Sequence, residues 1–173
     1  MPITVNANPA RLTWANFTTV LNLTDPNDGT VVDAVTEFNY NIPNMPPRTV
    51  NGMQALAQIF QITITPNARV RTGITQTAGL LAHEQLHYDV GVAIARQLAR
   101  ELENLRAPDL AGLRTALQNA VTLHFHTRAR LIQNRYDIDS RHGTNAHYQQ
   151  VWARMITDAI ANPRSTKIGG FYL

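Results

Sequence analysis

The stretch His83-Glu84-Gln85-Leu86-His87 is the most informative part of the sequence, and it lies inside a long helical pattern. Two histidines four positions apart share one helix face, with Cβ atoms about 5–6 Å apart. Both imidazoles can therefore reach one zinc ion at roughly 2.0–2.1 Å. Glu84 follows the first histidine, where its carboxylate can take a proton from a metal-activated water. The motif H-E-x-x-H predicts two metal ligands, His83 and His87, and a general base, Glu84.

The residues around the motif favour a helix over about residues 75–106. Thr75 and Thr77 are suitable N-caps, and no proline interrupts the pattern before Pro108. Apolar side chains recur at helical spacing, namely Leu80, Leu81, Leu86, Val90, Ile94, Leu98, Leu102 and Leu105. One alternative stays open, because so short a motif also arises by chance. In that case the two histidines only pack in a core or lie on the surface.

Length and composition indicate one globular domain. The 173 residues are enough for a single domain over 1–173 with its own core. Cysteine is absent, which excludes disulfides and thiolate ligands, so any metal site must use His, Asp or Glu. No apolar run of about 18 residues exists, so no membrane span is expected. The first three residues lack the basic and apolar regions of a signal peptide.

Charge is unevenly distributed along the chain. Residues 1–90 hold four basic and six acidic residues, whereas residues 91–173 hold eleven basic and six acidic ones, and all but one of the basic residues are arginine. An Arg-rich helical half could meet an anionic partner. A solvated helix surface explains the same pattern. No nucleic-acid-binding motif is present, so no nucleic-acid partner is expected.

Strands and loops are expected over the first 72 residues, which are rich in Thr, Val, Asn and Pro. Residues 31–40 read as a strand after the Asn27-Asp28-Gly29 turn, and the prolines of residues 42–47 indicate a loop. Residues 57–65 read as a second strand, ended by Pro66-Asn67. Residues 12–21 fit either a short helix or a strand.

Helices are expected over the remainder. Pro108 ends the first helix, and Asp109 can cap a second over about residues 110–135. A third spans about residues 145–161. Strands followed by helices predict an α+β fold. We expect a small N-terminal antiparallel sheet packed on the long active-site helix, with an antiparallel second helix and a C-terminal helix.

A catalytic zinc site usually takes a third protein ligand and leaves one position for water. The candidates are Glu101, Glu103, His124, His126, Asp137, Asp139, His142 and His147. If the two long helices pack antiparallel with the turn at Pro108, residue 129 of the second helix lies beside His87 of the first. Both glutamates then lie too far along the helix, and the segment 136–147 can fold back across the site. His142 precedes the flexible Gly143 and is the predicted third ligand, although a surface-loop histidine would look the same.

The expected chemistry is zinc-dependent hydrolysis of an amide bond. Zn²⁺ held by His83, His87 and His142 would polarise the scissile carbonyl and lower the pKa of its water toward about 7. Glu84 would take the proton and deliver it to the leaving amine.

Supporting roles are harder to assign from the sequence. The oxyanion needs a donor besides zinc, and Tyr136 ranks before Arg141 and His147. Asp137 or Asp89 could orient a ligand imidazole, although Asp89 faces away from His87 and could instead tie the helix to a nearby loop. The strand over residues 57–65 could offer a sheet edge to which an extended peptide adds. Such binding predicts broad specificity.

Several further motifs resemble those of a bacterial family, domain of unknown function 922. The chain has H-E-Q-x-H-[FY]-D at residues 83–89 and Y-D-x-x-[TS]-x-H at residues 136–142. Gln149, Trp152, the pair Ala95-Arg96 and an opening like L-x-W-x-D-F at residues 12–17, with Asn16 in place of the usual Asp, complete the match. Family members are described as predicted secreted zinc-dependent proteases. The resemblance implies a zincin-like fold, a role for His142 and a secreted or periplasmic location.

The sequence thus predicts a zinc metallopeptidase that acts on a peptide or protein substrate. Two alternatives remain. One is an Arg-rich helical binding module for an anionic partner, with a structural zinc or none. The other is a zinc amidase that hydrolyses a non-peptide amide, such as a cell-wall crosslink.

Overall fold

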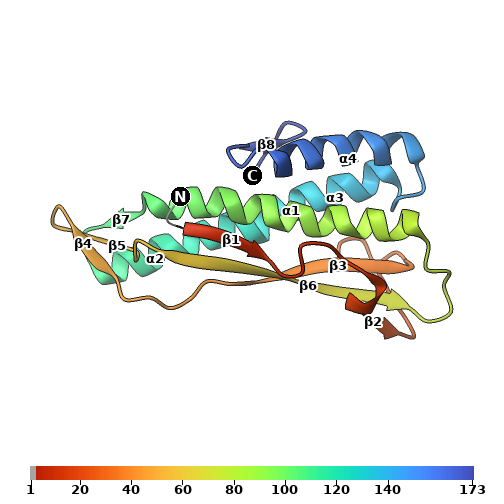
Figure 1. Ribbon diagram of the computed structural model, residues 1–173, viewed down its shortest axis with the longest axis horizontal. Helices are drawn as coiled ribbons and strands as arrows, with labels where there is room; N and C mark the ends of the chain where they lie inside the picture. The colour runs from red at the N-terminus through yellow and green to blue at the C-terminus, as the bar shows by residue number, and fades with distance from the viewer. Residues whose placement is uncertain (1–2) are drawn as a thin grey trace.

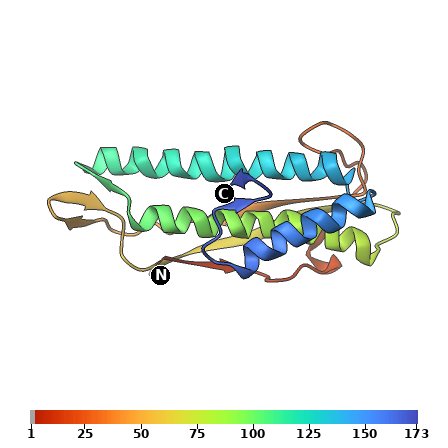
Figure 2. The same ribbon diagram turned by 90° about the horizontal axis from the view of Figure 1, so that it is seen from above.

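The computed structural model describes residues 3–173, which form a sheet layer covered on one face by helices (Figure 1). The helix α1 (Ala78–Glu103) lies directly on the sheet. A long helical rod and α4 (Ala146–Ala161) lie on its two sides when the molecule is seen from above (Figure 2). The α+β class expected from the sequence is confirmed. None of the described helices combines the length and apolar character needed to span a membrane.

The main sheet is mixed and is centred on β6 (Phe60–Arg71). β3 (Ala34–Asn41) pairs with β6 antiparallel. On the other side of β6, β1 (Ile3–Ala7) and β2 (Phe17–Val20) pair with it in parallel, one after the other. β3 therefore keeps one edge unpaired in this sheet, and β6 is an inner strand. The expectation that the strand following residue 57 forms the exposed edge is wrong.

β6 also continues through Pro66, where the sequence analysis expected a strand end. β1 covers β6 only up to Ile64, and β2 begins to pair at Ala68. The carbonyl of Ile64 accepts a hydrogen bond from the Asn8 N–H, so this residue faces β1. Pro66, two positions on, faces the same side, opposite the gap between β1 and β2. No ladder hydrogen bond is lost there, and the proline is tolerated.

Two small β-elements complete the fold. β4 (Arg48–Val50), β5 (Met53–Ala55) and β7 (Arg106–Ala107) form an antiparallel sheet at one end of the molecule. β8 (Lys167–Ile168) and β9 (Phe171–Tyr172) form a hairpin beside α4. The region expected to be ambiguous holds a short 3₁₀ helix, η1 (Trp14–Asn16), followed by β2. Asn16 still caps this turn, because its side-chain oxygen accepts from the Thr13 N–H at 2.8 Å.

The second long helix extends further than expected. α2 (Leu110–Val121), a π-helical segment η2 (Thr122–Arg128) and α3 (Ala129–Ser140) form one continuous rod. It begins at the Asp109 cap, whose carboxylate accepts from the Gly112 N–H at 2.7 Å. The core lies between the sheet and these helices, and its fully buried aliphatic side chains include Ile62, Ile64, Ile94, Leu98, Ile132 and Ile156. Each contributes about 1.5–3 kcal/mol by burial.

Candidate metal centre

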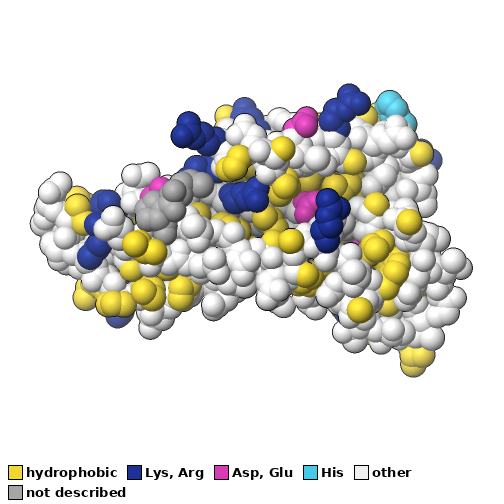
Figure 3. Space-filling view, viewed as in Figure 1, with side chains coloured by type: hydrophobic (Ala, Val, Ile, Leu, Met, Phe, Trp, Pro, Cys, Tyr) yellow, Lys and Arg dark blue, Asp and Glu magenta, His cyan; other side chains and the backbone are white. Residues whose placement is uncertain are grey.

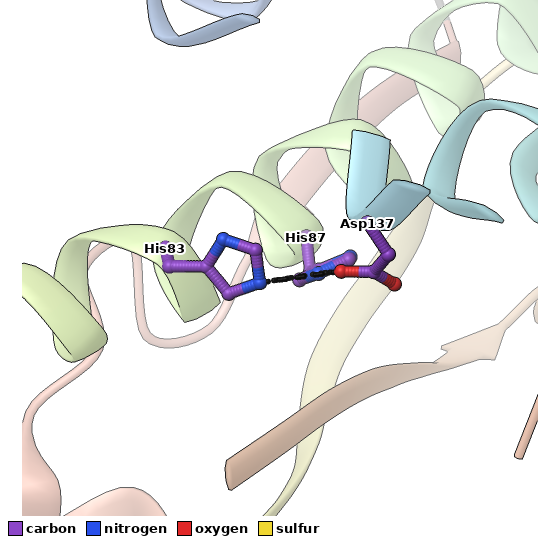
Figure 4. Close-up of side chains that lie close together, drawn as sticks. All are labelled: His83, His87 and Asp137. Carbon is purple, nitrogen blue, oxygen red and sulfur yellow. Dashed lines mark hydrogen bonds and ion pairs between the residues drawn. The ribbon is translucent and has the colours of Figure 1, made fainter. Parts of the chain in front are cut away.

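Three side chains from two helices converge on one point (Figure 4). His83 and His87 lie one turn apart on α1, and Asp137 comes from the last turns of α3. Asp137 Oδ1 lies 2.9 Å from His87 Nε2 and 3.2 Å from His83 Nε2, and the two Nε2 atoms are 3.2 Å apart. All three residues are buried, with exposed fractions between 3% and 7%. They form a group that could hold a metal ion.

These distances fit one small cation. Two ligand atoms about 2.0–2.2 Å from a tetrahedral zinc ion lie roughly 3.3–3.6 Å apart, slightly more than the separations between these three atoms. Small side-chain rotations would close the difference. The donor set of two imidazoles and one carboxylate is typical of catalytic zinc sites. The residues present therefore fit the metal that the motif predicts.

Neighbouring groups fix the orientation of His83. Its Nδ1 lies 3.1 Å from Gln149 Oε1, so the Nδ1–H donates to that oxygen and the Nε2 lone pair faces the cluster. The hydroxyl of Tyr136 donates to the same Gln149 oxygen at 2.8 Å. The Tyr136 ring lies against both imidazoles, with centroid distances of 4.7 Å and 4.9 Å. Tyr136 and Gln149 thus hold His83 in the tautomer that a metal needs.

Electrostatics at the cluster favour a positive charge between the three groups. Burial lowers the pKa of His87, but the carboxylate of Asp137 outweighs burial and raises the pKa above the ordinary histidine value. Burial raises the pKa of Asp137, but the imidazoles of His87 and His83 outweigh it and hold the pKa well below the usual range. A site that attracts protons in this way also attracts a metal cation, which competes for the same lone pairs.

Glu84 lies beside the cluster and is almost entirely buried, with 2% exposure. Burial raises the pKa of its carboxyl, while the imidazoles of His87 and His83 oppose the rise. Its Oε2 has no hydrogen-bond partner among residues 3–173. A buried carboxylate oxygen without a partner is costly. It is explained if this oxygen faces a reacting water.

The cluster opens into a cleft of about 1290 Å³. One wall is β3 and the residues just before it, and the other is the η2–α3 part of the long rod. Besides Phe125, five residues of the rod line the cleft and recur every three or four positions, so they form one face of the helix: His126, Arg130, Gln133, Asp137 and Arg141. His83, Glu84 and His87 line the cleft from α1. The cluster is therefore reachable from solvent along an extended groove.

Asp137 lies beside the two imidazoles, in the place that the sequence analysis gave to His142. The expected pairing of the two long helices had a tight turn at Pro108, which would place residue 129 beside His87. In the structure the chain leaves α1, runs on as β7, and starts α2 beyond the end of α1 (Figure 2). The rod is shifted accordingly and remains helical to Ser140, so Asp137 reaches His87. Asp137 was among the candidates, and its place on the polar stripe of the rod is the signal that could have ranked it higher.

His142 lies next to the centre but outside the group of His83, His87 and Asp137; with Asp25 and Asp28 it forms a second, more exposed group of possible ligands. Its Nδ1 is 3.7 Å from Asp137 Oδ1 and 3.5 Å from Asp25 Oδ2, and its Nε2 is 3.7 Å from Asp28 Oδ2. The rod ends there with positive φ angles of 50° at Arg141 and His142 and 82° at Gly143. A Cβ on Gly143 would lie 3.0–3.2 Å from the His83 side chain, so only glycine fits this approach.

Tyr136 is fully buried, and its hydroxyl faces Gln149 instead of the cleft. Burial raises the pKa of this phenol, which keeps its proton for that hydrogen bond. This placement differs from the role expected at the oxyanion. Of the other two donors considered, Arg141 lines the cleft and His147 does not.

Two expected exclusions agree with the geometry. His124 is buried and binds Glu101, with 2.7 Å between Nε2 and Oε2, so these residues pair with each other. Asp89 does not touch the cluster: it accepts from Gln85 Nε2 at 2.8 Å, and Gln85 Oε1 in turn accepts from the Leu12 N–H at 2.7 Å. Asp89 thus helps to tie α1 to the loop before η1, as expected.

Comparisons with known proteins add one finding. Residues 10–143 match the family model described as "Bacterial protein of unknown function (DUF922)". This range includes His83, Glu84, His87, Asp137 and His142 and covers more than half of the chain. No curated protein and no solved structure matched the chain.

Proposed function

The chain belongs to the DUF922 family of bacterial proteins, and we propose that it is a zinc-dependent metallopeptidase. The observation that carries this proposal is the placement of Glu84 beside the cluster of His83, His87 and Asp137 at the base of an open cleft. His83, His87 and Asp137 would hold the zinc ion. When bound, zinc supplies a Lewis acid that activates water and polarises the scissile carbonyl.

The chain's own residues supply the proton transfers. Glu84 takes a proton from the attacking water as the new C–O bond forms, and it passes that proton to the leaving nitrogen as the C–N bond breaks. Its unpartnered, buried Oε2 supports this role. Gln149 and Tyr136 keep His83 Nε2 free for the metal and act as positioning residues. Asp137 offsets the positive charge of the site.

The cleft supports an extended substrate. Among residues 3–173, no strand pairs with the edge of β3 that faces away from β6, and β3 residues line one wall of the cleft. A peptide can add to this edge by main-chain hydrogen bonds, which places one of its peptide bonds near Glu84. Main-chain recognition of this kind supports a peptide or protein as substrate. A secreted or periplasmic location is part of this proposal and rests on the family resemblance alone.

The binding-module alternative finds less support. On the face shown in Figure 3, the Lys and Arg side chains stand apart from one another, with acidic side chains among them. A single basic patch, which a polyanion would need, is not seen on that face. The built cluster with its buried base favours an enzyme.

The test combines metal content with hydrolysis. We expect about one zinc per chain in protein purified without added metal, and cleavage of an unfolded protein mixture that a chelator stops. Two variants form a matched pair. His83→Ala should lose both zinc and hydrolysis, whereas Glu84→Gln should keep zinc and lose at least 100-fold in hydrolysis, since the base contributes about 10²–10⁴-fold. Full hydrolysis by Glu84→Gln, or wild-type protein that binds no zinc, would refute the proposal.

A further inference from the structure

Arg130 is a charged side chain that the proposed reaction does not use. It lies on α3, is exposed, and lines the cleft. It forms no ion pair with any other residue between 3 and 173. Seven residues separate it from Asp137, so the two share one face of α3 and lie two turns, or about 10 Å, apart.

The other charges of the cleft leave Arg130 uncompensated. Glu37 pairs with Arg69 at 2.9 Å, and Asp33 pairs with Arg71. Asp137 lies against His87 of the centre, and Asp25 lies 3.5 Å from His142, next to the centre. Tyr40 and His126, beyond Arg130, bind each other at 3.1 Å and bring no carboxylate to this part of the cleft. A guanidinium in such a groove attracts a carboxylate of a bound molecule.

The direction of β3 places Arg130 relative to a bound peptide. Along β3, Thr36 lies beside Glu84, and Tyr40 lies beside Phe125 and His126 of η2. β3 therefore runs from the metal centre toward η2. An antiparallel peptide, the more stable pairing at a sheet edge, enters with its N-terminal part beside η2 and its C-terminal part beyond the centre. Arg130 then faces the part that precedes the scissile bond.

The distance between Arg130 and Asp137 indicates which residue of the peptide faces Arg130. An extended strand advances about 3.4 Å per residue, so about 10 Å corresponds to three residues. We infer that Arg130 is a specificity residue for an acidic side chain three positions before the scissile bond. This inference rests on the proposed peptidase function and gives that site a substrate class, peptides with Asp or Glu on the N-terminal side of the cut.

A charge swap tests the inference. Two peptides that differ only by Glu or Lys at that position are compared with wild-type protein and with Arg130→Glu. We expect wild type to favour the Glu peptide by about 2- to 5-fold in kcat/KM, the range for an exposed ion pair, and to lose this preference at high salt. Arg130→Glu should reverse the preference. Arg154→Glu, an exposed change on α4 outside the cleft, alters net charge equally and should leave the preference unchanged.

A second readout separates this inference from the proposed chemistry. Binding of the same fluorescent peptides to Glu84→Gln, measured by anisotropy, should show the same order and the same reversal when Arg130→Glu is added. If no variant cleaves but the binding order holds, the peptidase proposal fails and the role of Arg130 stands. Equal binding and cleavage of both peptides, no binding of either, or an acidic preference only after the scissile bond would each overturn the inference.

Discussion

Asp137 Oδ1 is the atom on which the two imidazoles converge, and it accounts for the form of the site at the scale of single residues. Two neutral Nε2 atoms at 3.2 Å would repel each other without a proton or a cation between them. Gln149 Oε1 accepts a hydrogen bond from the Nδ1–H of His83, which leaves the Nε2 lone pair of His83 free. The remaining lone pairs point to one place, which is why the site fits a metal ion.

The assignment of the third ligand gives a prediction at this scale. Asp137→Ala should lower zinc affinity by at least 100-fold, because it removes a direct ligand and leaves two histidines. His142→Ala should keep about one zinc per chain, because it leaves His83, His87 and Asp137 intact and alters only the second group, with Asp25 and Asp28. Zinc content after dialysis against a weak chelator measures both, with circular dichroism as the control for folding. The reverse result, zinc lost with His142 and kept without Asp137, would make His142 the ligand.

At the scale of elements, the cleft depends on how closely α1 approaches β3. Gly91 on α1 packs under the Phe38 ring of β3, and a Cβ at this position would lie 2.5 Å from the ring. The Phe38 ring also meets Phe125 of η2, with centroids 5.6 Å apart. The Phe38 ring thus contacts both α1 and η2, so α1, β3 and η2, which line the cleft, pack against one another at this point.

We therefore expect Gly91→Ala to destabilise the protein by about 1–2 kcal/mol, because the strain of overpacking exceeds the gain in helix propensity. Urea unfolding measures the change. Gly79→Ala is the matched control on the same helix, since its Cβ would meet only Thr77 Oγ1 at 4.0 Å. This control should be neutral or stabilising by up to about 1 kcal/mol. Adding Phe38→Leu to Gly91→Ala should restore part of the lost stability, and equal effects of the two glycine changes would contradict the packing argument.

At the scale of the whole molecule, the metal centre joins α1 to the far end of the rod. His83 and His87 belong to one helix and Asp137 to another, 50 residues later than His87. A cation that binds all three links segments that only the folded chain brings together. Zinc should therefore stabilise the native state by mass action.

This stabilisation should grow with pH. In the zinc-free protein the raised pKa of His87 favours the folded state below the ordinary value of 6.5, and this contribution is lost as pH rises through the folded pKa. Zinc needs the deprotonated imidazole, so its affinity rises over the same range. The difference in Tm with and without zinc should be larger at pH 8 than at pH 5.5, as measured by thermal unfolding. His87→Ala should abolish the difference at both pH values, and a difference that shrinks toward pH 8 would contradict the assignment.

Features that depend on short-range geometry could be predicted from the sequence. The spacing of His83 and His87 and the position of Glu84 follow from 3.6 residues per turn, and the helical pattern around them is strong enough to place α1. The α+β fold class and the order of the helices also follow from the local pattern of apolar residues, and the absence of thiolate ligands follows from the composition. The tertiary structure alone decided which strand has a free edge and which residue completes the cluster. β6 continues through Pro66 because β1 and β2 leave a gap opposite it, and Asp137 rather than His142 lies closest to His83 and His87 because the connection through β7 shifts the rod along α1. Both outcomes depend on the register between distant segments, which is set by packing and by the path of the connections rather than by any local pattern.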